Sequence, residues 1–168
     1  MQLVQLPVNI NLQHCKVMEK DHYIGVDISK KTIDVAIYVK DQAKKGTFPH
    51  ETFQNTAVGF KDMKRWLRKQ SVVLSKSLFC MEATGNYTYE LCLFLEQMGV
   101  AYSIQSPLHL KRSFGLTHGK NDKVDASRIA YYAYLHREDI KLSKLASGNV
   151  RKLKSLIAER KSLVVEIA

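Results

Sequence analysis

Two runs rich in Ile, Val and Tyr, at residues 22–28 and 32–40, stand only three polar residues apart. β-Branched and aromatic residues favour strands. The short polar connection Ser29-Lys30-Lys31 can join two such strands as an antiparallel hairpin. The sequence therefore predicts that the folded part of the chain opens on a β-hairpin.

The remaining periodicities alternate between strand and helix. In chain order they predict a strand over 46–53, a helix capped by Thr56, a strand over 77–82, a helix ended by Gly99, a strand over 100–105, and a helix over 122–136. This order is typical of an α/β fold in which helices flank a mixed sheet. It is the ribonuclease H-like layout.

Charge is distributed unevenly along the 168 residues. The net charge is +10, and residues 106–168 carry 13 basic and 6 acidic residues. Such an excess predicts a polyanionic partner, with nucleic acid ahead of a membrane because no stretch is typical of a basic membrane-surface helix. A merely solvated basic surface is the alternative.

The sequence divides into three predicted parts. Residues 1–20 form a leader of unknown role, residues 21–140 the α/β domain, and residues 148–168 the start of a coiled-coil helix. The apolar heptad pattern begins at Val150 and stops at Ala168 without a cap. This predicts that the chain is an N-terminal part of something longer or a naturally shortened version of it. We expect the coiled coil to support a homo-oligomer.

Several classes of protein are disfavoured. No apolar run approaches the length of a bilayer span, and the first 20 residues lack the pattern of a signal peptide. The cysteines, Cys15, Cys80 and Cys92, are too widely spaced to predict a disulfide framework or a zinc site. Cys80 and Cys92 are expected in the core, and a reducing cytoplasm fits this pattern best.

Two carboxylates stand at the ends of predicted strands. Asp27 lies near the end of the first strand, where a charge in an apolar run is costly unless it is paired or bound to metal. Glu82 ends the fourth strand, at the edge where open α/β sheets bind ligands. The alternatives are a turn-initiating role for Asp27 and a capping or ion-pairing role for Glu82. Asp34 is expected to face solvent.

Two further carboxylates begin the predicted helix over 122–136. Asp122 and Asp125 are three residues apart, so their side chains lie on one helix face and can reach a shared cation. A capping box at the helix start is the competing interpretation. With Asp27 and Glu82, they make a set of hard oxygen ligands suited to Mg²⁺ or Mn²⁺.

Three segments resemble the signature blocks of one family. Residues 23–30, 81–87 and 120–126, in that order, resemble the blocks of the DEDD-type transposases, or recombinases, of the insertion-sequence-110 group. The resemblance covers about residues 22–136. It implies a fold like that of the RuvC Holliday-junction resolvase, with Asp27, Glu82, Asp122 and Asp125 as the catalytic, metal-binding set.

The same resemblance has implications beyond the metal site. It implies metal-dependent processing of DNA, oligomeric assembly on DNA and, in some members, a structured guide RNA. Full-length members also carry a C-terminal domain with a serine implicated as the nucleophile, and nothing in this sequence corresponds to that domain. The chain alone is therefore expected to be incomplete as a recombinase.

Basic and aromatic residues surround the predicted carboxylate set. The candidate phosphate-binding residues are Lys111, Arg112, Lys120, Lys123 and Arg128. Nearby tyrosines are candidates for base stacking, although core packing is expected for most of them: Tyr87, Tyr89, Tyr131, Tyr132 and Tyr134.

Two other functional classes compete with a transposase. Kinases of the actin and sugar-kinase type also open on a strand, an Asp and a hairpin, but the turn here lacks their phosphate-binding glycines. A nucleic-acid-binding module without catalysis, or a truncated transposase remnant, remains the main alternative.

Overall fold

The first two strands form the predicted hairpin. In the computed structural model, which describes residues 20–39, 48–114 and 122–146, β1 (His22–Ile28) pairs antiparallel with β2 (Thr32–Val39). The Ser29 amide donates to the Thr32 carbonyl at 2.9 Å, and the Thr32 amide donates to the Ser29 hydroxyl at 3.0 Å. The polar connection is thus a tight turn, as predicted.

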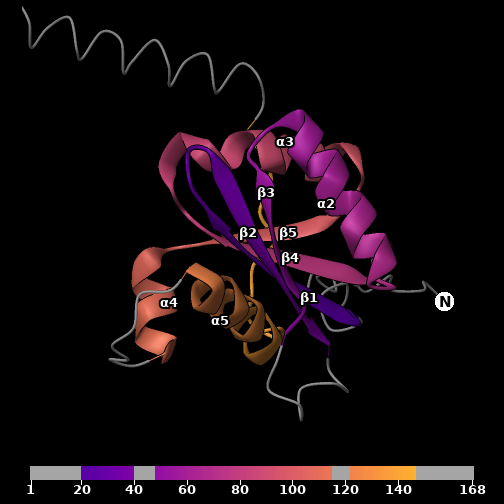
Figure 1. Cartoon of the computed structure of the whole chain (residues 1–168). Helices are drawn as coiled ribbons and strands as arrows, with labels where there is room; N and C mark the ends of the chain where they lie inside the picture. Colours follow the sequence, from indigo (N-terminus) through magenta and orange to yellow (C-terminus); the bar gives the residue numbers. More distant parts are fainter. Residues whose placement is uncertain (1–19, 40–47, 115–121, 147–168) are drawn as a thin grey trace, which may run out of the picture.

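Five strands form one mixed sheet (Figure 1). Their order is β3-β2-β1-β4-β5, with β3 (His50–Gln54) antiparallel to β2. β4 (Ser77–Glu82) and β5 (Ala101–Gln105) run parallel to β1. The predicted ribonuclease H-like α/β fold is confirmed, and the carboxyl ends of β1, β4 and β5 share one edge region of the sheet.

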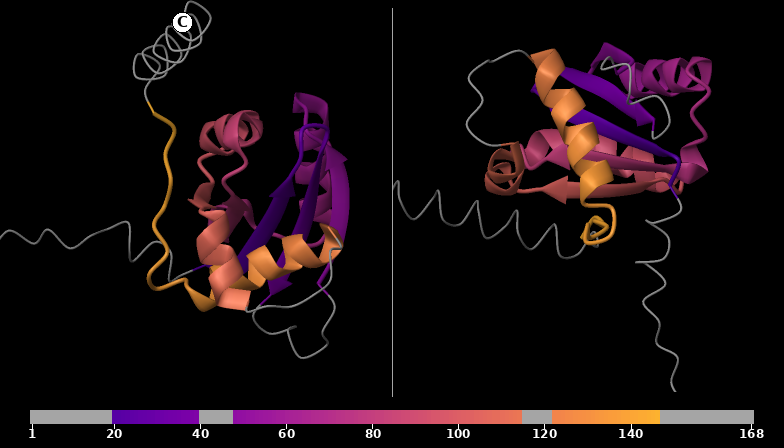
Figure 2. Two further views of the ribbon diagram at one scale, coloured as in Figure 1. Left: turned by 90° about the vertical axis from the view of Figure 1, so that its left-hand side faces the viewer. Right: turned by 90° about the horizontal axis from the view of Figure 1, so that it is seen from below.

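Helices cover both faces of the sheet (Figure 2). They are α2 (Ala57–Lys69), α3 (Tyr89–Gln97), α4 (Pro107–Phe114) and α5 (Asp122–Leu135), with short 3₁₀ turns η2 (Leu74–Lys76) and η3 (Gly85–Thr88). Thr56 caps α2 as predicted, because its hydroxyl accepts from the Gly59 amide at 3.2 Å.

Side chains alternate between the two faces of the sheet along each strand, and they form one apolar cluster on each face. Ile24, Val26 and Met81 pack under α2 and α3 with Phe60, Met63, Leu67, Leu91 and Leu95. On the other face, Tyr23, Leu78 and Cys80 pack under α5 with Ile129, Ala130 and Ala133. Cys80 and Cys92 are fully buried, which confirms their predicted place in the core.

The structure differs from the sequence predictions in two elements. The sequence predictions include no helix between the strand over 100–105 and the helix over 122–136, whereas the structure has the helix α4 there. The third strand begins at His50, so residues 48–49 of the predicted strand are not part of it, and residues 46–47 lie outside the described residues. The predicted leader and coiled coil lie almost wholly outside the described residues.

Within residues 20–39, 48–114 and 122–146, no helix is both long enough and apolar enough to cross a bilayer.

Candidate active site

Asp27 and Glu82 lie on the same face of the sheet. Val26 and Met81 are register partners in the parallel β1–β4 pair, and both are fully buried in the cluster under α2 and α3. Successive side chains of a strand point to opposite faces, so Asp27 and Glu82, one residue further on, point to the face that α5 covers. Both are half-buried. The carboxylates at the ends of β1 and β4 are therefore neighbours across the sheet.

The helix α5 lies directly on β1 at Gly25. A Cβ atom there would lie 2.0 Å from the Ala126 carbonyl oxygen and 2.3 Å from the Ala130 amide nitrogen. Further along, the ring of Tyr134 lies 5.4 Å from the ring of Tyr23. The helix thus runs antiparallel to β1, and its first turns point toward the carboxyl end of the strand (Figure 1).

This direction carries the two helical aspartates toward Asp27. Asp125 directly precedes Ala126, and Asp122 begins the helix one turn earlier. Asp125 is half-exposed and forms an ion pair with Arg128, 3.5 Å between Oδ1 and Nη1. The side chain of Asp122 lies outside the described part of the structure. The helix therefore brings Asp125 to the end of the sheet that carries Asp27 and Glu82.

The predicted carboxylate ligands are of the right chemical type for a divalent cation, but the described side chains are not arranged around one common point. Carboxylate oxygens are the ligands that Mg²⁺ and Mn²⁺ prefer. Among the described side chains, however, no three acidic, His or Cys groups are arranged to hold a metal ion together. Asp27, Glu82, Asp122 and Asp125 remain the predicted ligands, of which the structure places three side chains.

Asp34 does not face solvent as expected. Asp34 is the register partner of Asp27, and its side chain is only 16% exposed. It accepts a hydrogen bond from the Thr52 hydroxyl, and its Oδ1 lies 3.6 Å from Nε2 of His50. The expectation was wrong because β3 pairs with β2 beside Asp34 and supplies both of its partners, Thr52 and His50. A half-buried aspartate opposite Asp27 therefore adds negative charge beside the site.

Asn55 ties together the loops around the carboxylates. Its side-chain amide donates to the Ser29 carbonyl at 2.9 Å and to the Tyr87 carbonyl at 3.1 Å. Ser29 follows Asp27 in the β1–β2 turn, and Tyr87 lies in the turn after Glu82. One side chain thus fixes both loops that leave the carboxylate-bearing strands, and the sequence contained no signal for this role.

The predicted phosphate-binding residues differ in how exposed they are and in whether they are paired with an acid. Lys111 and Arg112 are exposed on α4. This helix packs on α5 through buried Leu110, and the Ser113 hydroxyl lies 3.4 Å from Nε2 of His136. Arg128 is held by Asp125. The side chains of Lys120 and Lys123 lie outside the described residues. The structure thus places Lys111 and Arg112 on the helix beside α5.

Most of the candidate stacking tyrosines pack in the protein. Tyr132 is buried, and Tyr134 stacks on Tyr38 with ring centroids 4.4 Å apart. Tyr87 and Tyr131 are 46% and 40% exposed, so they alone among the described candidates offer a large open ring surface. Tyr89 is half-buried.

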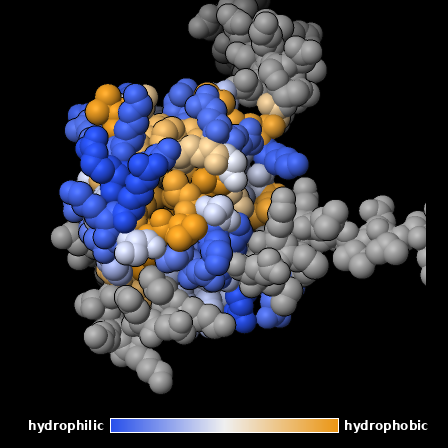
Figure 3. Space-filling view, turned by 90° about the vertical axis from the view of Figure 1, so that its right-hand side faces the viewer, coloured by the Kyte–Doolittle hydropathy of each residue, from blue (hydrophilic) through white to orange (hydrophobic). Residues whose placement is uncertain are grey.

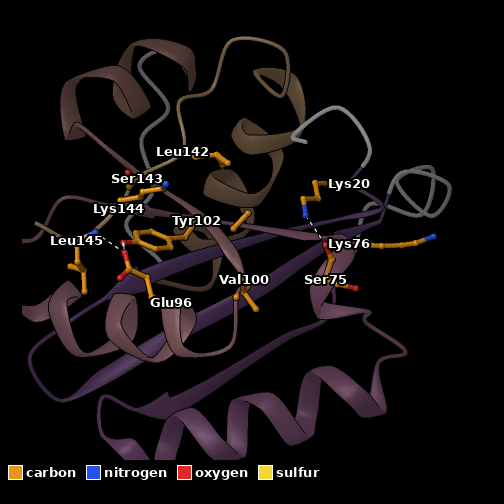
Figure 4. A pocket seen from close by; sticks show the side chains of 12 residues that line it. Lys20, Ser75, Lys76, Glu96, Val100, Tyr102, Leu142, Ser143, Lys144 and Leu145 are labelled. Carbon is orange, nitrogen blue, oxygen red and sulfur yellow. Dashed lines mark hydrogen bonds between the residues drawn. The ribbon is translucent and has the colours of Figure 1, made fainter. Parts of the chain in front are cut away.

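A separate hollow lies at the other end of the sheet (Figure 4). It has a volume of about 850 Å³ and is lined by Lys20, Lys76, Val100, Tyr102 and Leu145, among others. Glu96 there accepts hydrogen bonds from the Tyr102 hydroxyl at 2.7 Å and the Leu145 amide at 2.6 Å. Lys76 and Ala101 stand at the amino ends of β4 and β5, so the hollow is distinct from the carboxylate site.

Comparison with known proteins agrees with the geometry. The model of a transposase family, that of the insertion-sequence-110 group, matches residues 24–168. Pilin gene-inverting proteins of Moraxella bovis and Moraxella lacunata are each 30% identical to the chain over 141 residues. These alignments cover 82% of the chain and 41% of each relative, so the chain spans about two fifths of their length. The chain belongs to the transposase family of the insertion-sequence-110 group.

Proposed function

We propose that the chain is the catalytic domain of a DNA transposase or recombinase that cleaves phosphodiester bonds during transposition of an insertion sequence. Asp27, Glu82, Asp122 and Asp125 are its catalytic residues and metal ligands. The observation that carries the proposal is the packing of α5 on Gly25, which directs Asp125 toward the end of the sheet where Asp27 and Glu82 lie together.

The cofactor in this proposal is Mg²⁺ or Mn²⁺. Divalent ions at such a site activate a nucleophile and stabilise the charge on the leaving oxygen. The protein's own contribution is to gather the carboxylates on two strands and one helix. Asp34 and Asp27, on paired positions, increase the local negative charge, and this favours cation binding.

DNA enters, in this proposal, along α4 and α5. The exposed Lys111 and Arg112 contact phosphates, together with Lys120 and Lys123 in the connection between the two helices. Arg128, which pairs with Asp125 in this structure, would be available to contact a phosphate if Asp125 held a cation. A structured guide RNA and a second copy of the chain, bound through residues 148–168, are further proposed partners, and the proposed compartment is the cytoplasm.

A nucleic-acid-binding module without catalysis is the second candidate. It is favoured by the ion pair between Asp125 and Arg128, which neutralises Asp125 without a metal. Binding of nucleic acid without catalysis would also require only the basic residues and not the four carboxylates.

Nicking of a supercoiled plasmid in the presence of Mn²⁺ tests the proposal. Although the chain alone is expected to be incomplete for recombination, we expect the wild-type chain to nick the plasmid. Asp27→Asn should lose at least about a hundredfold in rate, because the change removes a charged ligand but little volume. Asp62→Asn, at a partly exposed carboxylate on α2, is the matched control and retains nicking.

Two outcomes would contradict the proposal. A folded Asp27→Asn protein with near-normal nicking excludes Asp27 as a ligand. A wild-type chain that binds the plasmid but never nicks it supports the second candidate.

A further inference from the structure

The outward side of α2 carries a continuous row of cations. Counted from the first, the five residues fall at positions 0, 3, 4, 7 and 8, which places them on one helix face: Lys61, Lys64, Arg65, Arg68 and Lys69. We name these five residues the α2 cationic stripe. At a rise of about 1.5 Å per residue, the stripe is about 12 Å long.

The packing of α2 holds this stripe outward. Phe60, Met63 and Leu67 are buried against the sheet and α3. Four of the five cations are exposed, and Lys64 is half-buried. Figure 3 shows this side of the molecule with a band of hydrophilic side chains next to the apolar surface. The orientation of the stripe is thus fixed by the core.

The charge of the stripe is poorly compensated. Asp62 is the one acidic residue of α2, and it pairs with Arg65 at 2.8 Å. Within the described residues, no ion pair involves another member of the stripe. The neighbouring helix α3 carries Glu90 and Glu96 and no Lys or Arg. The cations are therefore concentrated on one helix and not mixed with acids, as a merely solvated surface usually is.

The stripe and the carboxylates lie on opposite faces of the sheet. The buried side of α2 belongs to the cluster that contains Val26, whereas α5, Asp27 and Glu82 lie on the other face. The helix α4, which carries the exposed Lys111 and Arg112, packs beside α5 through Leu110. Phosphates that contact α2 thus belong to a different stretch of nucleic acid from those at the carboxylates.

We propose that the α2 cationic stripe is a second DNA-binding surface, which holds a duplex segment away from the carboxylate site. Duplex DNA carries one charge per about 1.7 Å of axis, so a stripe of this length faces several phosphates. The inference rests on the proposed function only in taking DNA as the partner. Contacts of this kind anchor the duplex without reading its sequence.

Matched charge-neutralised variants of the 168-residue chain test the inference. The first variant combines Lys61→Gln, Lys64→Gln and Lys69→Gln, and Gln is a good helix former. The control combines Lys76→Gln, Lys141→Gln and Lys144→Gln, which are exposed lysines outside α2. Both variants have the same net charge. Binding to a 40-base-pair duplex is measured as a function of salt, and a hairpin RNA of equal charge serves as the competitor.

We expect the stripe variant to bind the duplex at least about tenfold more weakly at low salt. The slope of log affinity against log salt should fall by about 2 to 3, roughly 0.9 for each lost phosphate contact. The control should change the slope by less than about one. In wild type, the duplex should protect Lys61, Lys64 and Lys69 from acetylation, which tests the surface without any substitution.

The outcomes separate this inference from the proposed function. Equal losses in the two variants, or no protection of the three lysines, overturn the inference and leave plasmid nicking untouched. If the stripe variant loses binding to the hairpin RNA but binds the duplex normally, the inference is also overturned, because the surface would then bind RNA and not DNA. If wild type binds no DNA even at low salt, the proposed function fails as well.

Discussion

Gly25 lies so close to α5 that an added Cβ atom would be 2.3 Å from the amide nitrogen of Ala130. The strand and the helix therefore touch through their main chains, and a side chain at this position has no room. This contact fixes the distance between β1, which carries Asp27, and the helix that carries Asp122 and Asp125.

Gly25→Ala should separate the helix from the strand. Because the obstructing atoms belong to the backbone, we expect a loss of about 2–3 kcal/mol in the free energy of unfolding. We also expect a smaller stabilisation by Mn²⁺, measured by thermal melts with and without the ion. Gly99→Ala, which meets no atom within 4 Å but has φ of +65°, is the control and should lose stability while keeping the metal effect. An unchanged Mn²⁺ effect in Gly25→Ala would contradict this role.

Asn55→Ala should loosen the two loops that follow Asp27 and Glu82. The change removes two hydrogen bonds to the carbonyls of Ser29 and Tyr87, and we expect a loss of about 1–3 kcal/mol in unfolding free energy. Hydrogen exchange should quicken at both loops. Asn86→Ala, at an exposed asparagine of η3, is the control. Equal exchange rates in the two variants would show that Asn55 does not join the loops.

Glu96→Gln should destabilise the protein in a pH-dependent way. Glu96 accepts hydrogen bonds from the Leu145 amide and the Tyr102 hydroxyl. Both bonds lower the pKa of this carboxyl, and the bond from Leu145 has the larger effect. A lowered pKa in the folded state stabilises the fold above the unfolded value of about 4.3. The wild type should therefore exceed the variant by about 1 kcal/mol near neutral pH. Urea unfolding should show this difference shrinking as pH falls below about 4.3 and through the folded pKa. A difference independent of pH would contradict the assignment.

Cys80 and Cys92 should be unreactive in the native protein. Burial raises the pKa of both thiols to about 12, and the thiolate is the reactive form. In a Cys15→Ser background, an aromatic disulfide reagent at pH 8 should titrate neither thiol before unfolding and both in denaturant. Rapid titration of either thiol in the native state would refute the buried core positions.

The elements of this fold with strong local signals could be predicted from the sequence. The hairpin, the Thr56 cap and the apolar strand ending at Glu82 all depend on residues close together in the chain. The helix α4 was missed because it has only eight residues, and among its residues Leu110 is the one described as buried.

The long-range contacts could not be predicted. Asp34 shows the alternation of an exposed strand position, but its low exposure depends on His50 and Thr52 of a neighbouring strand. The close contact of Gly25 with α5 joins residues about a hundred positions apart, and a glycine within a strand is equally typical of a bulge or a tight bend. The four carboxylates were predicted because they stand near element ends, whereas the relative positions of Asp27, Glu82 and Asp125 depend on long-range packing of the strands and α5.

The most direct test of the metal site is the thermal stability of Asp125→Asn with and without Mn²⁺. We predict that its melting temperature without metal stays close to that of wild type. Asp125 is half-exposed, its ion pair with Arg128 contributes little, and removing one carboxylate relieves repulsion. Wild type should gain about 2.7 kcal/mol at a Mn²⁺ concentration one hundred times its Kd, and the variant should lose most of that gain. Asp62→Asn should behave as wild type. If Asp125→Asn melts lower in both conditions with the Mn²⁺ gain intact, Asp125 stabilises the helix and is not a metal ligand.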